Sequence, residues 1–178
     1  LWVNMVSSVT LAMVLAFEPT EPGTMRQAPR PAAEPLLRGD VVWRIGFIAL
    51  LFLIGAFGMF TWAVGRGLPL EVARTMVVNT LVVMEIFYLF SVRYSYGASL
   101  TWKGLLGTPA VLAGLAAVVS LQFAFTYLPL LAIPFDTAPI PFAYGLLVVA
   151  TGPVLFLIVE LEKHLRRLWL DRRRAAAV

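Results

Sequence analysis

The 178-residue sequence has no cysteine, only one histidine, and few charged residues, which make up 13% of the chain. Without cysteine there can be no disulfide, no thiolate metal ligand and no cysteine nucleophile. The single imidazole of His164 cannot build a histidine metal cluster either. Hydrophobic residues, in contrast, make up 60% of the chain and the mean hydropathy is +0.86. Soluble domains are roughly 45–50% apolar, so the composition indicates an integral membrane protein.

The net charge of +4 and the isoelectric point near 9.9 raise the alternative of nucleic-acid binding. Most basic residues, however, flank apolar segments or lie in the tail KHLRRLWLDRRR. Basic clusters of this kind set membrane orientation and bind lipid headgroups, so no nucleic acid is expected as a partner. The chain begins at Leu1 inside an apolar run, without the basic region and cleavage site of a signal peptide, which predicts a fragment of a longer protein.

Five apolar segments approach the length of about 20 residues that a membrane span needs. They are Leu1–Phe17, Ile45–Val64, Thr75–Val92, the run from Thr108 to a stop at Pro129, and the run from about Pro141 to about Val159. Thr108 and Pro109 are a good N-cap and first-turn proline for the fourth segment. Gly152 and Pro153 predict a kink or local unwinding in the fifth. The predicted fold is an all-α polytopic bundle of five transmembrane helices.

The connection from Glu18 to Asp40 contains five prolines and mixed charge, which predicts an extended surface loop. Its membrane side follows from the excess of basic residues in cytoplasmic loops. With this loop in the cytoplasm, only Arg66 and Arg74 lie outside, whereas the rest of the basic residues and the tail lie inside. The C-terminus is therefore expected in the cytoplasm.

Three polar residues lie close together in the first segment. On an α-helix, Asn4, Ser7 and Ser8 fall within an arc of about 100° and present three oxygens to one neighbour. Hard cations bind amide, hydroxyl and carboxylate oxygens, so this face suits part of a cation site. Hydrogen bonding between packed membrane helices, worth about 0.6 kcal/mol per contact, is the simpler explanation for these three residues alone.

A carboxylate inside the third segment favours the functional explanation. Placing Glu85 in a spanning helix costs about 2.5 kcal/mol or more, so it should face a partner, a cavity or an ion. Arg74 and Arg93 are about three and two helical turns away, which is poor placement for a structural ion pair. Asn79 lies on a different side of the same helix from Glu85.

Other polar residues have ordinary structural explanations. Ser120 and Gln122 in the fourth segment are expected to form packing hydrogen bonds. Charged residues at the end of the fifth segment have the spacing of an interfacial charge network: Glu160, Glu162, Lys163 and Arg166.

Two stretches give a family resemblance. The run LWVNMVSS, followed by LAMVLAFEP and by Met25 with Pro29-Arg30, resembles the sixth membrane helix and following loop of P-type cation-transporting ATPases of the calcium-pump and sodium-pump type. The opening Ala73–Met76 of the third segment, Glu85 within it, and the sequence ELEK at 160–163 resemble the C-terminal helices of the same pumps. The resemblance covers essentially the whole chain and implies a fold like the calcium-ATPase transmembrane domain.

The resemblance also implies a set of cation ligands. In the family pattern LWVN-x-x-TD the asparagine falls on Asn4, the threonine on Ser7 and the aspartate on Ser8, while an acid of the eighth helix falls on Glu85. Serine in place of aspartate removes a negative charge, which argues against a high-affinity calcium site and favours monovalent cations or protons. The transported ion stays open between monovalent and divalent cations.

The resemblance divides the chain into a cation-site helix at 1–17, a cytoplasmic proline-rich loop at 18–41, a four-helix membrane domain at 42–160 and a basic cytoplasmic tail at 161–178. The sequence carries no DKTG phosphorylation motif and no nucleotide-binding or actuator domain. Mg-ATP and its hydrolysis are thus expected of a parent ion translocase in the plasma membrane, whose other domains and helices are this chain's partners together with lipid. The alternative is a stand-alone membrane scaffold whose polar residues serve only helix packing.

Overall fold

The computed structural model describes residues 1–17, 37, 39–93 and 108–175, and all the regular structure in these ranges is helical. The chain starts with a π-helix, η1 (Val3–Ser8), which continues directly into α1 (Val9–Ala16). The remaining helices are α2 (Gly39–Gly65), α3 (Leu70–Arg93), α5 (Pro109–Tyr127), the short α6 (Pro129–Phe135) and α7 (Phe142–Ala175).

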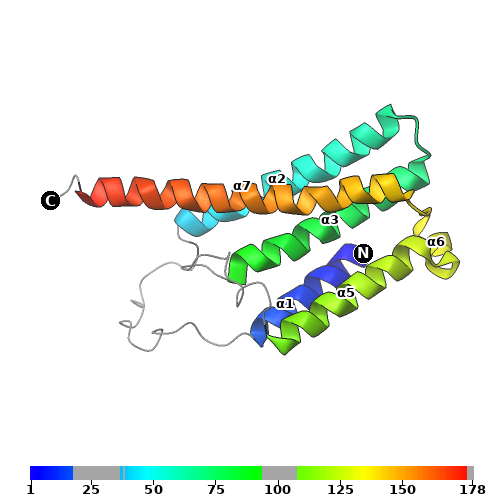
Figure 1. Ribbon diagram of the computed structural model, residues 1–178, viewed down its shortest axis with the longest axis horizontal. Helices are drawn as coiled ribbons and strands as arrows, with labels where there is room; N and C mark the ends of the chain where they lie inside the picture. Colours follow the sequence, from blue (N-terminus) through cyan, green and yellow to red (C-terminus); the bar gives the residue numbers. More distant parts are fainter. Residues whose placement is uncertain (18–36, 38, 94–107, 176–178) are drawn as a thin grey trace.

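Helix α3 lies at the centre of the bundle, with α2 and α7 on one side and α1 and α5 on the other (Figure 1). It contributes to each of the three apolar cores. One core joins α3 to α1 and α5 through Leu11, Val14, Val82, Leu89, Val111 and Val118. The other two join α3 to α2 and α7, through Met59, Ala63, Ala73, Met76, Ile140 and Val148 and through Met84, Leu155 and Val159.

Glycines let two of these helix pairs approach closely. A Cβ on Gly114 of α5 would lie 2.2 Å from Cγ2 of Val14 on α1. A Cβ on Gly152 of α7 would lie 2.2 Å from the Phe87 ring on α3. Small residues at membrane-helix contacts permit such approach.

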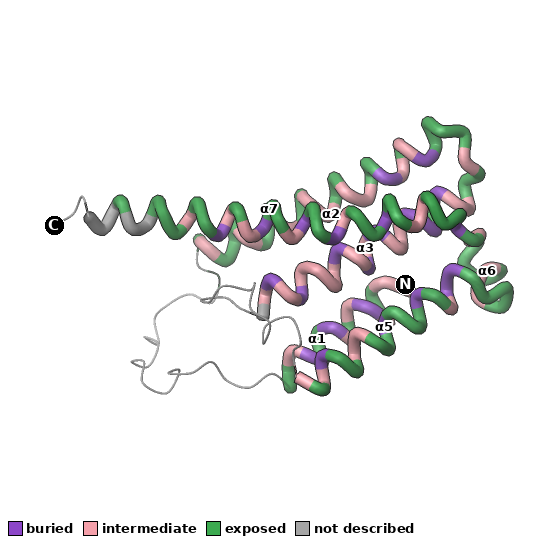
Figure 2. The backbone as a smooth tube through the Cα atoms, viewed as in Figure 1, coloured by how far each residue is buried: buried purple, intermediate pink, exposed green. Residues whose placement is uncertain are grey.

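Four helices are long and apolar enough to cross a membrane: Gly39–Gly65, Leu70–Val92, Pro109–Tyr127 and Phe142–Trp169. The helix over Val3–Ala16 is also apolar but shorter. Figure 2 shows exposed residues along the outer flanks of α2 and α7, and many of these are large hydrophobics. The all-α transmembrane bundle predicted from the sequence is therefore confirmed.

Local signals give mixed outcomes. The Thr108 hydroxyl accepts a hydrogen bond from the Val111 N–H, and Pro109 is the first residue of α5, as predicted. Of the kink or local unwinding predicted at Gly152 and Pro153, unwinding does not occur, since α7 stays helical through both residues. The helix also continues past Val159, because the tail is rich in leucine, arginine and glutamate, which are good helix formers.

The predicted proline-rich loop lies mostly outside the described residues. Only Leu37 and the residues from Gly39 onward are described, and Gly39 and Asp40 already begin α2.

Candidate functional site

The residues of the polar cluster in the first segment lie on a π-helix. Its backbone hydrogen bonds close from i to i+5, so each turn is wider than the α-helical turn assumed from the sequence. The Ser7 hydroxyl donates to the Val3 carbonyl oxygen over 2.7 Å, which satisfies that hydroxyl within the segment. Short π-helical stretches are rare and occur frequently at functional sites.

Ser8 and Glu85 meet across the interface between η1 and α3. The Ser8 hydroxyl donates a hydrogen bond of 2.5 Å to Oε1 of Glu85, although 77 positions separate the two residues. Oε2 of Glu85 is buried and has no hydrogen-bond partner among the described residues. Half of the carboxylate is thus held by the first helix, and the other half is available to a further group.

A structural ion pair with Arg74 does not explain Glu85. Arg74 forms its ion pair with Asp136 at the start of the α6–α7 connection, near the opposite end of α3. The Arg93 side chain lies outside the described residues.

The structure does not place all four candidate ligands together. Ser7 is buried beside Ser8, at 1% exposure, and lies close to the Glu85 carboxylate. Asn4, in contrast, is exposed. Of the three polar residues of the first segment, Ser8 thus contacts Glu85 and Ser7 lies buried beside it, whereas Asn4 is exposed. Among the described residues, no three histidine, aspartate or glutamate side chains form a metal-binding group.

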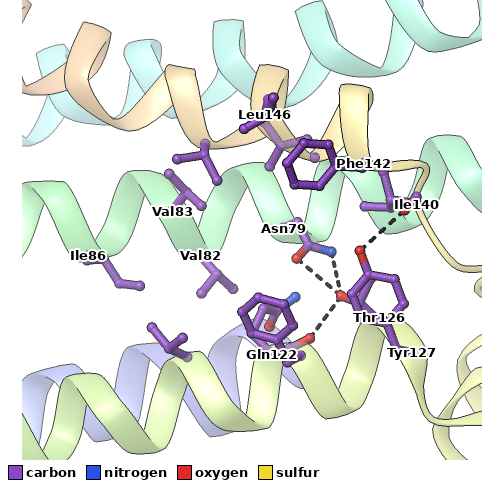
Figure 3. Close-up of a pocket in the computed structure, with 15 residues that line it drawn as sticks. Asn79, Val82, Val83, Ile86, Gln122, Thr126, Tyr127, Ile140, Phe142 and Leu146 are labelled. Atoms are coloured by element: carbon purple, nitrogen blue, oxygen red, sulfur yellow. Dashed lines mark hydrogen bonds between the residues drawn. The ribbon is translucent and has the colours of Figure 1, made fainter.

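A second polar cluster links the first helix to α3 and α5. Trp2 Nε1 donates to Gln122 Oε1 over 2.9 Å. Asn79 Nδ2 donates to Thr126 Oγ1 over 3.0 Å (Figure 3). It also donates to the Thr75 carbonyl oxygen over 2.9 Å. Packing bonds for Gln122 and a different helix side for Asn79 and Glu85 were predictable from the sequence, whereas the roles of Trp2 and Thr126 were not.

A charged cluster joins the other ends of α3 and α7. Lys163 Nζ donates to the Ser91 carbonyl oxygen over 2.6 Å and to Oε1 of Glu160 over 2.8 Å. The Ser91 hydroxyl donates to the same carboxylate over 2.9 Å. Trp43 of α2 donates to Glu162 over 3.1 Å. Of the charge network predicted for this segment, the pair between Glu160 and Lys163 is confirmed, whereas Arg166 pairs with Asp40 of α2. These contacts join α7 to α3 and α2 at this end of the bundle.

Comparison with known proteins gives the family. Residues 1–165 match the family model described as "Cation transporting ATPase, C-terminus". The chain is 37% identical over 172 residues to the protein named "Probable cation-transporting ATPase F" of Mycobacterium tuberculosis, covering 94% of this chain and 18% of that protein. It is 39% identical over 144 residues to "Cation-transporting ATPase pma1" of Synechocystis, covering 78% of this chain and 16% of that protein.

A more distant relative is "Calcium-transporting ATPase 1" of Yarrowia lipolytica, with 24% identity over 164 residues, covering 92% of this chain and 18% of that protein. The chain thus spans less than a fifth of the length of the relatives it matches. The family model matches nearly the whole chain, and the all-helical membrane bundle agrees with it. The chain therefore belongs to the family of cation-transporting ATPase C-terminal regions.

Proposed function

We propose that this chain is the membrane part of an ATP-driven cation pump and supplies part of the site that the transported cation occupies. The observation that carries the proposal is Glu85, a carboxylate inside a spanning helix with one oxygen held by Ser8 and the other unpartnered. An ionisable group in a membrane span is costly and is by default a functional group.

The oxygens of Ser7, Ser8 and Glu85 suit a hard cation, which prefers carboxylate and hydroxyl ligands. One carboxylate and two hydroxyls are too few for a complete site, so the remaining ligands come from other helices of the pump. Asn4 is the fourth proposed ligand: its side chain is exposed in this chain, so its amide oxygen is open to groups from the other helices of the pump. With a single carboxylate from this chain, a monovalent cation is the favoured cargo.

In this mechanism, phosphorylation by Mg-ATP occurs in domains outside the chain and shifts η1 and α1 relative to α3. Because Ser8 and Glu85 lie on the two moving parts, the shift changes the geometry of the cation site. The pump lies in the plasma membrane, with the C-terminus of α7 in the cytoplasm, as the excess of basic residues on that side favours.

The test is Glu85→Gln in the intact pump that carries this chain. The amide keeps the size of the side chain but removes its charge, and a hydrogen bond or contact to a charged group contributes about 1.5–3 kcal/mol. We expect the cation concentration that half-activates ATP hydrolysis to rise about 10- to 100-fold.

The matched control is Glu71→Gln on the same helix, about 21 Å from Glu85 along the axis. It should leave the cation dependence unchanged. An unaltered cation dependence in Glu85→Gln would reject the site and favour a role in helix packing alone.

A further inference from the structure

The π-helix η1 is tied at both ends by side-chain hydrogen bonds to other helices. Trp2, its N-cap residue, donates from Nε1 to Oε1 of Gln122 on α5 over 2.9 Å. Ser8, its last residue, donates to Glu85 on α3 over 2.5 Å. The Ser7 hydroxyl is used within the segment. Between described residues, these two bonds are therefore the only side-chain hydrogen bonds from η1 to neighbouring helices.

The Trp2 indole also belongs to an aromatic cluster with Phe125 and Phe135. It stacks on Phe125 of α5, with the ring centroids 4.8 Å apart, and meets Phe135 of α6 edge-on at 5.7 Å. The Phe125 and Phe135 rings are 5.3 Å apart, and Phe125 is buried. Aromatic rings attract one another in stacked and edge-on geometries, so the cluster fixes both the position and the orientation of the indole.

Helix α6, which carries Phe135, is fastened to α3 through the connection that follows it. Asp136 forms an ion pair with Arg74, and the Ala138 N–H donates to the Thr75 hydroxyl over 3.0 Å. Helix α6 lies at the end of the bundle opposite the C-terminal end of α7 (Figure 1). The α6 part of the aromatic cluster is thus held in place by contacts that do not involve η1.

The position of Trp2 determines the position of the Ser8 hydroxyl. Ser8 follows Trp2 by six residues, fewer than two helical turns, so a shift of the first residue carries the second with it. A hydrogen bond between a hydroxyl and an oxygen spans about 2.5–3.0 Å, so a displacement of about 1 Å is enough to break the bond to Glu85.

We propose that Trp2 is a positioning residue of the cation site, because its anchorage on α5 and α6 holds Ser8 opposite Glu85. The inference rests on the proposed function of Glu85. It adds α5 and α6, which carry none of the four candidate ligands, to the parts of the chain that determine cation affinity. Trp2 itself does not contact the cation and acts through the Ser8 oxygen.

The experiment measures ATP hydrolysis by the intact pump against the concentration of sodium, potassium and calcium chloride in turn. With the salt that stimulates the unmodified pump, the titration separates the half-activating concentration from the maximal rate. Trp2→Phe keeps a ring in the cluster but removes the donor to Gln122. We expect the half-activating concentration to rise about two- to tenfold, the effect of one hydrogen bond, with the maximal rate unchanged.

Two further variants test the anchorage from other sides. Trp2→Leu also loses the aromatic contacts and should raise the half-activating concentration more than Trp2→Phe does. Gln122→Met breaks the same hydrogen bond from α5 and should act like Trp2→Phe. It replaces Trp2→Leu if that variant does not fold.

The matched control is Trp62→Phe on α2. Trp62 also meets a ring of another helix edge-on, Tyr144 of α7 at 5.6 Å, but this pair belongs to the core that joins α2, α3 and α7. The control should leave the half-activating concentration unchanged. An equal shift in Trp62→Phe and Trp2→Phe would overturn the inference, because it would show a general loss of packing.

A double variant shows whether Trp2 acts through Ser8. Ser8→Ala removes the hydroxyl that Trp2 is proposed to position, and contacts that act as one unit are not additive. Trp2→Phe should therefore raise the half-activating concentration much less in the Ser8→Ala pump than in the unmodified pump. The same factor in both would overturn the inference, because Trp2 would then act without Ser8.

Glu85→Gln, measured alongside, separates this inference from the proposed function. A shift in Glu85→Gln without a shift in the Trp2 variants would overturn the positioning role and leave the proposed function in place. No shift in Glu85→Gln would reject the proposed function, and the positioning role with it.

Discussion

At the scale of single residues, Ser8 decides the charge of the candidate cation site. Its hydroxyl lies 2.5 Å from Oε1 of Glu85, and the resemblance to the pump pattern would place an aspartate at this position. Ser8→Asp would bring two carboxylates into contact, an arrangement that repels unless a cation lies between them. We expect the variant to shift the preference of the pump toward divalent cations.

The measurement is ATP hydrolysis by the intact pump with a series of monovalent and divalent chloride salts. Ser8→Asp should lower the half-activating concentration of a divalent cation, and Ser8→Ala should not. If the two variants give the same cation preference, Ser8 does not contact the cargo.

The sequence predicted part of this site because its signals are local. A lone carboxylate in an apolar run identifies Glu85 without any knowledge of its neighbours. The exposure of Asn4 could not be predicted in the same way, because it depends on which neighbouring helices pack on η1, which composition does not encode. Likewise, the bond between Asn79 and Thr126 joins residues 47 positions apart and follows only from the packing of α3 on α5.

At the scale of helices, close packing of α7 on α3 depends on Gly152. A Cβ at this position would lie 2.2 and 2.5 Å from two ring carbons of Phe87 and 2.8 Å from Cγ1 of Val83. We expect Gly152→Ala to force the helices apart and to destabilise the bundle by about 1–3 kcal/mol, the usual cost of overpacking.

The control for this prediction is Gly58→Ala on α2, where the added methyl group meets nothing within 4 Å. Alanine is favoured over glycine in a helix by about 0.5–1 kcal/mol, so this variant should be neutral or stabilising. The midpoint of thermal inactivation in detergent measures the stability of both variants. Equal midpoints for the two variants would mean that α3 and α7 do not pack closely at Gly152.

Gly152 and Pro153 show why one local prediction, the unwinding of α7, is not met. Gly152 and Pro153 are helix breakers in isolation, which predicts unwinding. In the bundle, α7 keeps its helical course because the absent Cβ allows contact with Phe87 and Val83, and tertiary packing outweighs local preference. The N-cap at Thr108 was predictable because its stabilising contact is three residues away.

At the scale of the whole molecule, the bundle has two parts that meet at α3. On one side, η1 and α1 pack on α5, and on the other, α2 and α7 pack on α3 (Figure 1). The charged cluster of Lys163, Glu160 and Ser91 fastens α7 to α3. The joint between the first helix and α3, in contrast, consists of a few apolar contacts and the Ser8–Glu85 bond, so it is the more suitable place for movement in a transport cycle.

The lack of cysteine makes this arrangement directly testable by cross-linking. The Val14 Cβ lies 3.6 Å from the position of a Cβ on Gly114, within the usual Cβ–Cβ range of about 3.5–4.5 Å for a disulfide. The double variant Val14→Cys, Gly114→Cys in the intact pump should therefore form a disulfide on mild oxidation, provided that any cysteines elsewhere in the pump are replaced. Mass spectrometry detects the disulfide as a linked pair of tryptic peptides that disappears on reduction.

The pair Val14→Cys, Gly58→Cys is the control, because Gly58 has no side chain near its open face. It should stay reduced under the same conditions, and linkage in both pairs or in neither would contradict the packing of α1 on α5.

The linked protein also tests the mechanism. If α1 moves with α5 while the joint to α3 opens, the disulfide leaves cation-stimulated ATP hydrolysis intact. If hydrolysis stops and returns on reduction, the movement lies between α1 and α5, and the Ser8–Glu85 joint is not the part that opens.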